Sequence, residues 1–194
     1  DLLIGGFVRA HLNAFTDEEH TCFYARAHAD RWPDLLEVLV DMFLNSRFAP
    51  ADIARERDVI LEELAMYRDQ PAELVHDLLN ATQFPRHPLG RPVIGTRATL
   101  KRLRRADFLR YMDSHYTAPA TLIAAAGNLK HSDLVRRARL HSRTFRPGVV
   151  APFEPWTAKP TGPSVRMKVK DVEQTNLELG MRTVSRHDPR RHAL

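Results

Sequence analysis

Two short runs near the start of the chain, residues 9–16 and 20–28, alternate between apolar and polar positions. A period of two is typical of strands that bury one face. The polar sequence Thr16-Asp17-Glu18-Glu19 separates the runs and has the composition of a turn. The pattern therefore predicts a β-hairpin.

Helical spacing of apolar residues replaces this alternation in the middle of the chain. Proline punctuation helps to place the boundaries, since Pro33 suits a first helical turn and Pro50 can begin the next helix. Residues 85–95 carry three prolines and two glycines, which exclude a regular element there. Helices are predicted over residues 32–44, 54–69, 72–84, 106–115 and 132–145, the fourth following a basic loop.

Strand patterns return later. Residues 121–126 form a continuous apolar run before Gly127-Asn128, which predicts a buried strand. Residues 164–170 and 174–181 are two further strand candidates, and Asp188-Pro189 can begin another helix. The order of elements predicts an α+β fold, a mostly antiparallel sheet with helices packed on it. The proline-rich stretch 147–163 is interpreted as a loop inside one domain spanning residues 1–194.

Composition narrows the classes of protein. The 194 residues are 43% hydrophobic, enough for a core, and no apolar run approaches the roughly 20 residues of a membrane span. The single cysteine, Cys22, excludes an internal disulfide. Because the first residue is Asp1, we expect the chain to begin inside a longer polypeptide.

The net charge of +5 leaves a choice between two interpretations of the basic residues. An Arg-rich nucleic-acid-binding domain is one, but the densest run lacks interleaved aromatic side chains and zinc-finger spacing. A solvated surface or a domain interface is the other, and no nucleic-acid partner is expected. The run comprises Arg86, Arg91, Arg97, Lys101, Arg102, Arg104, Arg105 and Arg110, against Asp107 alone.

The helix 54–69 contains two carboxylates at unusual positions. At about 100° per residue, Glu56 and Glu63 fall only about 20° apart, between the Ile60 stripe and the side of Val59 and Met66. A carboxylate in such an apolar sector needs a partner, or it loses its charge. A basic partner or a stem that reaches water is one interpretation, and a metal ligand with a supporting carboxylate is the other.

A series of landmarks in a fixed order surrounds this helix, and with them the chain resembles the pitrilysin/insulinase family of zinc peptidases, in the branch of the mitochondrial processing peptidases. The resemblance covers nearly the whole chain and implies one copy of that family's domain, truncated at both ends. The landmarks are Gly5-Gly6, Asn13-Ala14-Phe15-Thr16, Glu19, residues 21–24, Glu56-Arg57, Val59-Ile60-Leu61-Glu62-Glu63, Asp69-Gln70-Pro71, His87-Pro88-Leu89-Gly90-Arg91-Pro92, Gly95-Thr96, Tyr116 and Ala124-Ala125-Ala126-Gly127-Asn128.

The resemblance implies a zinc-dependent metalloendopeptidase with one zinc ion. The family binds zinc through two histidines of an H-x-x-E-H motif and a glutamate further along the chain. That glutamate corresponds to Glu63, and Glu56 corresponds to a carboxylate that supports the ligands without touching the metal. Glu62 points to the polar face and is not assigned.

The histidine motif itself does not occur in this sequence. Its nearest imitation, Thr16-Asp17-Glu18-Glu19-His20, has Thr in place of the first His, so His20 is interpreted as non-ligating. The remaining ligands are expected upstream of Asp1, and this chain alone should neither bind zinc tightly nor cleave peptides. The alternative is a non-catalytic partner or structural subunit of the same family.

The resemblance also assigns a substrate site and partners. Asn13, Ala14, Phe15 and Thr16 correspond to the strand that pairs with an extended peptide substrate through its backbone. A second homologous domain or subunit is the other expected partner. The loop that begins at His87 is interpreted as structural.

Overall fold

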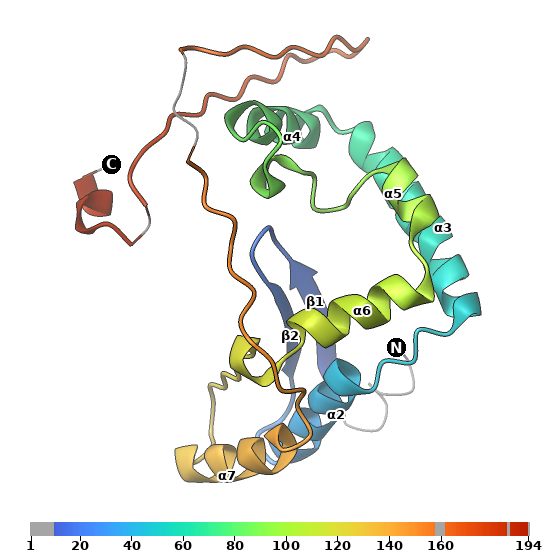
Figure 1. The fold of residues 1–194 in the computed structure, drawn as a ribbon, viewed down its shortest axis with the longest axis vertical. Helices are drawn as coiled ribbons and strands as arrows, with labels where there is room; N and C mark the ends of the chain where they lie inside the picture. The colour runs from blue at the N-terminus through green and yellow to red at the C-terminus, as the bar shows by residue number, and fades with distance from the viewer. Residues whose placement is uncertain (1–9, 158–161, 186, 194) are drawn as a thin grey trace. The chain divides into compact units, whose positions relative to one another are not determined.

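The computed structural model describes residues 10–157, 162–185 and 187–193 (Figure 1). The landmark Gly5-Gly6 lies outside these residues. The fold is α+β, as predicted, with one antiparallel pair of strands and six α-helices in the described part. The elements are β1 (His11–Thr16), β2 (Thr21–Arg26), α2 (Trp32–Leu44), α3 (Pro50–Arg68), α4 (Pro71–Gln83), η1 (Pro88–Gly90), α5 (Arg97–Arg102), α6 (Arg105–His115), η2 (Ala118–Ala120), α7 (His131–Ser142) and η3 (Pro189–Ala193).

The chain divides into two compact units. The first unit comprises Asp1–Ile60 and Arg97–Phe153, and the second comprises Leu61–Thr96 and Glu154–Leu194. Helix α3 passes from one unit to the other. The single domain over residues 1–194 stays a prediction.

The predicted hairpin is confirmed in the first unit. Strands β1 and β2 pair antiparallel, with His11 opposite Arg26 and Thr16 opposite Thr21. The Asp17 carboxylate closes the turn, because it accepts hydrogen bonds from the backbone N–H groups of Glu19 and His20 at 2.8 and 2.7 Å. An Asp that bonds the backbone two and three residues ahead is a common way to stabilise a turn.

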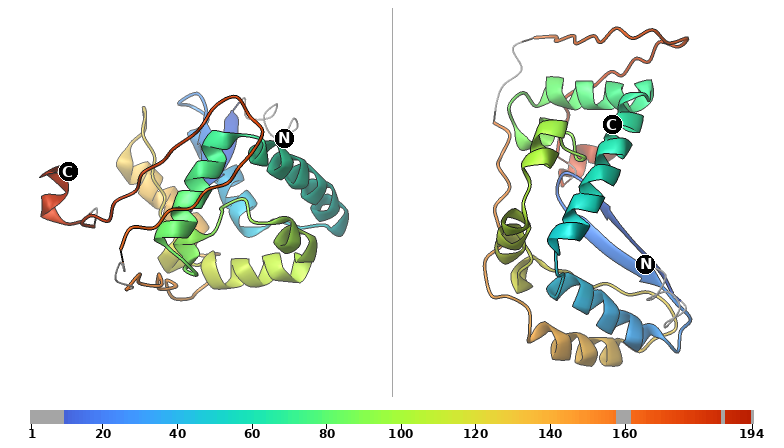
Figure 2. Two further views of the ribbon diagram at one scale, coloured as in Figure 1. Left: turned by 90° about the horizontal axis from the view of Figure 1, so that it is seen from above. Right: turned by 90° about the vertical axis from the view of Figure 1, so that its right-hand side faces the viewer.

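The core of the first unit lies around α2. Leu35, Leu36 and Val40 are buried on this helix, which packs against β2 and α7, as Figure 2 shows for α7. A cluster of aromatic rings extends the core: Phe43 stacks on Tyr116 at a centroid distance of 4.9 Å and lies 5.3 Å from Phe145. Helical spacing on α2 thus buries one apolar side, as predicted.

The second unit is organised around α4 and the loop that follows it. Helix α4 packs against η1. His87 is buried, and its ring lies edge-to-face against Trp156 at 5.2 Å. Its Nε2 donates a hydrogen bond to the Glu154 carbonyl oxygen, and its Nδ1 accepts one from the Leu89 N–H. His87 therefore joins two chain segments, in agreement with a structural role for this loop.

The three later strand predictions are wrong for this structure. Residues 121–126, 164–170 and 174–181 belong to no sheet; the last two are drawn as irregular, open chain in Figure 1. Val165 is 90% exposed and Leu177 is 91% exposed. A strand needs a neighbour for its backbone hydrogen bonds, and alternation alone does not supply one.

Two smaller predictions also need correction. The basic loop expected before residue 106 contains helix α5 (Arg97–Arg102), and the helix expected from Asp188 is only the short η3. None of the helices in the described ranges is long and apolar enough to cross a membrane.

Candidate functional site

Glu56 and Glu63 both project from the exposed side of α3. Met66, which was expected to bound an apolar sector beside Glu63, is 66% exposed, whereas Leu64 is only 4% exposed. The expectation that the two carboxylates lie in a buried apolar sector is therefore wrong for the described residues. Period alone defines the faces of a helix, but the packing of other elements decides which face is buried.

Neither carboxylate has a hydrogen bond or ion pair to any residue that the structure describes, so both are solvated here. Two helical turns separate them by about 10 Å along the axis. A zinc ligand must approach to about 2 Å. The assignment of Glu63 as ligand and Glu56 as its support stays a prediction.

The described residues do not fit a complete zinc site. Nowhere among them do three or more His, Cys, Asp or Glu side chains gather closely enough to hold a metal ion. Glu63, the predicted ligand, would supply one of the three protein ligands that catalytic zinc requires. His20 lies in the hairpin turn with its Nδ1 2.8 Å from the Asp17 carboxylate.

Residues 13–16 form most of β1, the candidate peptide-binding strand. Only β2 pairs with β1 among the described strands, so the opposite edge of β1 has no described neighbour. The Asn13 side chain accepts a hydrogen bond from the Ala14 N–H at 2.8 Å. Phe15 is exposed and lies against the rings of His20 and Tyr24. The strand can offer backbone groups along that edge.

Arg57 fixes the start of α3 against α5, a role that the sequence reasoning missed. Its guanidinium donates hydrogen bonds to the carbonyl oxygens of Leu100 and Leu103, at 3.1 and 2.7 Å. These carbonyls lie at the C-terminal end of α5, where helices leave unsatisfied acceptors and favour a cation. An arginine within a helix carries no signal of a partner more than 40 residues away.

Tyr67 is a second residue without a sequence signal. Its hydroxyl donates a hydrogen bond to the Glu73 carbonyl oxygen at 3.2 Å. Desolvation, together with the nearby Asp77 and Glu73 carboxylates, raises the pKa of Tyr67 to about 12. The phenol therefore stays protonated at neutral pH.

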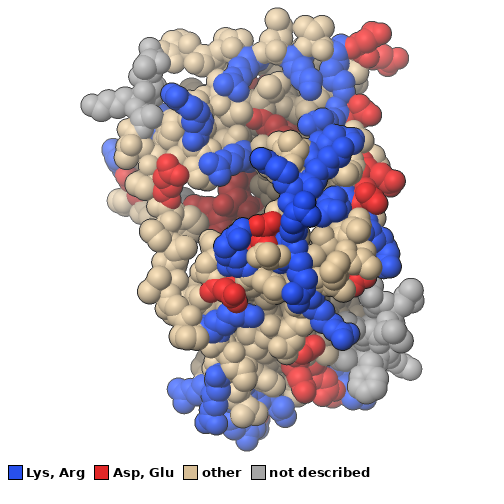
Figure 3. Space-filling model, turned by 45° about the vertical axis from the view of Figure 1, so that its right-hand side comes forward, with Lys and Arg blue, Asp and Glu red and all other residues tan. Residues whose placement is uncertain are grey.

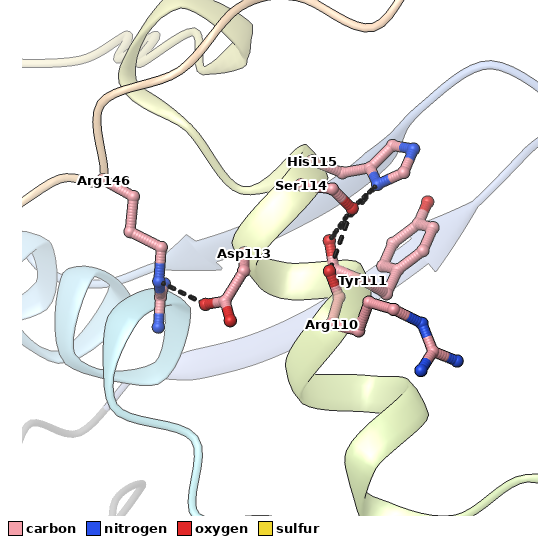
Figure 4. A network of polar contacts seen from close by, with 6 residues as sticks. All are labelled: Arg110, Tyr111, Asp113, Ser114, His115 and Arg146. Atoms are coloured by element: carbon pink, nitrogen blue, oxygen red, sulfur yellow. Dashed lines mark hydrogen bonds and ion pairs between the residues drawn. The ribbon is translucent and has the colours of Figure 1, made fainter.

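Figure 4 shows a serine and a histidine in contact on α6, a pairing that nucleophilic hydrolases use. Ser114 Oγ lies 2.7 Å from His115 Nδ1, but also 2.9 Å from the Arg110 carbonyl oxygen. Asp113 pairs with Arg146 at 3.0 Å, so it does not orient His115. The contact terminates a helix and lacks the third group of a catalytic triad.

Basic side chains gather on the face drawn in Figure 3. On α5, on α6 and at Arg104 between them, the lysine and arginine side chains are exposed. Asp107 lies among them, with a pKa lowered by hydrogen bonds from the Arg104 N–H and from the Arg110 side chain. These exposed residues are Arg97, Lys101, Arg102, Arg104, Arg105 and Arg110.

Comparison with family models gives two matches that together cover most of the chain. The model of the insulinase family of peptidases, M16, matches residues 7–97. The model of the M16 inactive domain matches residues 102–194.

Curated relatives give the same result. An uncharacterized zinc protease of Mycobacterium leprae is 38% identical over 190 residues, which cover 96% of this chain and 43% of the relative. The beta subunit of the mitochondrial-processing peptidase of Bos taurus is 34% identical, over 90% of this chain and 36% of the subunit. The chain thus spans about two-fifths of the length of the curated relatives that it matches.

Solved structures support the fold alone, because their sequence identities are low. The crystal structure of a peptidase M16 inactive domain from Pseudomonas fluorescens matches with a TM-score of 0.73 and 18% identity, over 80% of this chain and 38% of the other. A putative M16-like peptidase from Alicyclobacillus acidocaldarius matches with a TM-score of 0.62 and 18% identity, over 75% of this chain and 33% of the other.

Proposed function

Because the chain belongs to the insulinase family of peptidases, M16, we propose that it is part of a zinc-dependent endopeptidase that cleaves extended peptides. Within it we assign Glu63 as a zinc ligand. The observation that carries this assignment is the exposed Glu63 carboxylate on α3, which has no partner among the described residues and lies in the segment matched to the insulinase model.

The roles of the neighbouring carboxylates follow from their directions on α3. Glu63 supplies a charged oxygen ligand, while Glu56, two turns away, acts by hydrogen bonding to the other ligands. Glu62 lies on another side of the helix and takes no part. Bound zinc in such a site activates a water molecule for attack on the peptide bond.

The remaining ligands are proposed to be the two histidines of an H-x-x-E-H motif upstream of Asp1 in a longer protein. Supporting this, the chain spans only 43% of the length of a relative named a zinc protease. Reading the upstream codons tests the proposal. A reading frame without both histidines would contradict it.

The peptide substrate is proposed to bind along β1. Asn13, Ala14, Phe15 and Thr16 would extend the sheet by pairing with the peptide backbone, and the edge of β1 that has no neighbour among the described residues supports this. For that pairing the Asn13 side chain would release the Ala14 N–H. A peptide with proline at a paired position should bind more weakly, because proline lacks the donor.

Substitution of Glu63 by Gln in the longer protein tests the metal assignment. Peptidase activity and zinc content should both fall, since a neutral amide is a poor zinc ligand beside a carboxylate. Glu56→Gln should cost about 10- to 100-fold in zinc affinity or activity, as expected for a group that supports the ligands. Glu62→Gln, on the same helix, should change neither quantity. Full zinc occupancy in Glu63→Gln would contradict the assignment.

A non-catalytic family subunit is the second candidate. The match of residues 102–194 to the M16 inactive domain favours it. The same upstream codons decide between the two functions: an intact histidine motif supports the peptidase, and its loss supports a structural partner.

A further inference from the structure

A cavity of about 540 Å³ lies within the first unit, beside the N-terminal half of α3. Its walls come from the end of α2, the loop before Pro50, the first turns of α3 and the region of α5 and α6. This volume is in the range of small-molecule pockets.

The inner surface of the cavity is apolar and partly aromatic. Phe48 stacks on Phe108 with a centroid distance of 5.3 Å and an interplanar angle of 18°, and Ile53 and Leu103 also line the space. Phe48 adopts a left-handed backbone conformation, with φ 46°. Non-glycine residues take this conformation rarely, and the surrounding structure must hold them in it. Here that conformation accompanies a ring that lines the cavity.

Carboxylates dominate the charged part of the lining. Asp41, Asp52 and Glu56 all border the cavity. Asp52 has only a long, exposed contact of 3.5 Å with Arg55, and Glu56 has no partner in the described part of the chain.

The basic groups of the lining do not cancel these carboxylates. Arg57 directs its guanidinium to the carbonyl oxygens of Leu100 and Leu103. Arg47 is an exposed side chain at the cavity. With three carboxylates against two arginines, the lining keeps one formal negative charge in a chain whose net charge is +5.

We propose that this cavity binds an amphipathic organic cation, with its apolar body between Phe48, Ile53 and Phe108 and its ammonium or guanidinium group beside Asp41 and Asp52. An anion would face the carboxylates. Asp41 accepts one hydrogen bond, from the Asn45 side chain at 2.8 Å, and its carboxylate can accept another from a cationic ligand. Ligand sites combine an apolar lining with a few polar groups that fix orientation in this way. The proposed zinc ligand, Glu63, does not line the cavity, whereas Glu56, its proposed support, does.

Calorimetric titration of the 194-residue chain with phenylbutylamine, in the absence of zinc, tests the proposal. We expect saturable binding, and weaker binding of phenylbutanol, which has the same apolar body without the charge. In the double variant Asp41→Asn/Asp52→Asn the affinity for the amine should fall about tenfold, because two moderately exposed charge contacts are lost.

Two further variants separate this site from non-specific binding. Asp58→Asn removes a carboxylate from an exposed position of the same helix and should leave the affinity unchanged. Ala49→Trp should abolish binding by filling the cavity, and a melting curve of this variant checks that the chain remains folded. Equal affinity for amine and alcohol, an unchanged affinity in the double variant, or no saturable binding would each overturn the proposal. Because neither zinc nor Glu63 enters the assay, its failure leaves the peptidase proposal standing.

Discussion

At the scale of single residues, Tyr67 has a strongly raised pKa. Burial and the carboxylates of Asp77 and Glu73 raise its pKa to about 12 from the ordinary value of 10.0. Because the pKa is raised, there is a pH range in which the Tyr67 phenol is still protonated in the folded chain but already ionised in the unfolded chain. The associated stability is complete below pH 10 and is lost between pH 10 and 12.

Alkaline titration of tyrosinate absorbance checks this. The difference between the parent chain and Tyr67→Phe should show one phenol that ionises near pH 12. Denaturant unfolding should show a smaller loss of stability from pH 10 to 12 in Tyr67→Phe than in the parent chain. A difference spectrum with its midpoint near pH 10 would contradict the predicted environment.

His87 is the residue on which the loop of the second unit depends. It is only 5% exposed, and both ring nitrogens are hydrogen-bonded, to the Glu154 carbonyl oxygen and the Leu89 N–H. His87→Ala leaves both partners unsatisfied and opens a void beside Trp156. Urea unfolding should show a loss of about 2–3 kcal/mol.

His76→Ala is the matched control within the same unit. His76 lies 2.9 Å from Glu178, but its side chain is 55% exposed. An exposed pair contributes little, so the loss should stay below about 1 kcal/mol. Equal losses of unfolding free energy in the two variants would show that the His87 hydrogen bonds do not stabilise the loop.

At the scale of elements, two glycines lie so close to a neighbouring segment that a Cβ atom would overlap it. A Cβ on Gly90 would overlap the carbonyl oxygen of Phe84, which is fixed at the end of α4. A Cβ on Gly180 would overlap the side-chain amide of Gln83, which can rotate away. The same substitution therefore meets a rigid neighbour in one case and a flexible one in the other.

Gly90→Ala should destabilise the chain by about 2 kcal/mol, as overpacking against fixed atoms does. Gly180→Ala should cost less than about 1 kcal/mol, because the end of the flexible Gln83 side chain can move away. Melting temperatures of both variants check the order. A larger loss in Gly180→Ala would mean that Gln83 is held more firmly than its side chain suggests.

The helices show which elements a local sequence pattern can predict and which it cannot. Helix α2 was predicted over residues 32–44 and has those bounds, because Pro33 and five apolar positions at helical spacing give one consistent signal. Helix α5 was missed, because a run of arginines and lysines has no apolar period to read. On α3 the helix and the side of the Ile60 stripe that turns inward were predicted, but the sector of Glu56 and Glu63 is exposed and was expected to be apolar.

At the scale of the whole molecule, residues 164–181 present apolar side chains to solvent without strand partners. Val165, Met167 and Val169 are more than 80% exposed, as are Leu177 and Leu179. Backbone amides there should exchange with deuterium much faster than those of the β1–β2 ladder, which are hydrogen-bonded. Mass-spectrometric exchange makes the comparison, and equal protection of the two regions would contradict the absence of pairing.

The same exposed segments should affect solubility. Unpaired, alternating apolar runs favour association between chains. Val169→Lys together with Leu179→Lys should reduce light scattering at high protein concentration. Glu62→Lys, which adds positive charge at a position distant in sequence, is the control and should have a smaller effect.

The candidate site also contains residues that the sequence identified and contacts that only the structure revealed. The sequence identified Glu56, Glu63 and residues 13–16 by resemblance to a family, and their assignment stays a proposal. It did not find the tie from Arg57 to α5, the Tyr67 contact or the acidic cavity beside Phe48. Each of these features depends on contacts between residues remote in sequence or on a particular backbone conformation. No local sequence pattern could therefore predict them.

The sequence by itself determined the hairpin and the main helices, because turn residues and apolar periods act between neighbours a few positions apart. Only the tertiary structure decided that Glu56 and Glu63 on α3 are exposed, that residues 121–126 and 164–181 remain unpaired, and where a cavity forms. The physical reason is that the period of a segment fixes where its side chains point. Whether they meet other atoms or water depends on segments elsewhere in the chain.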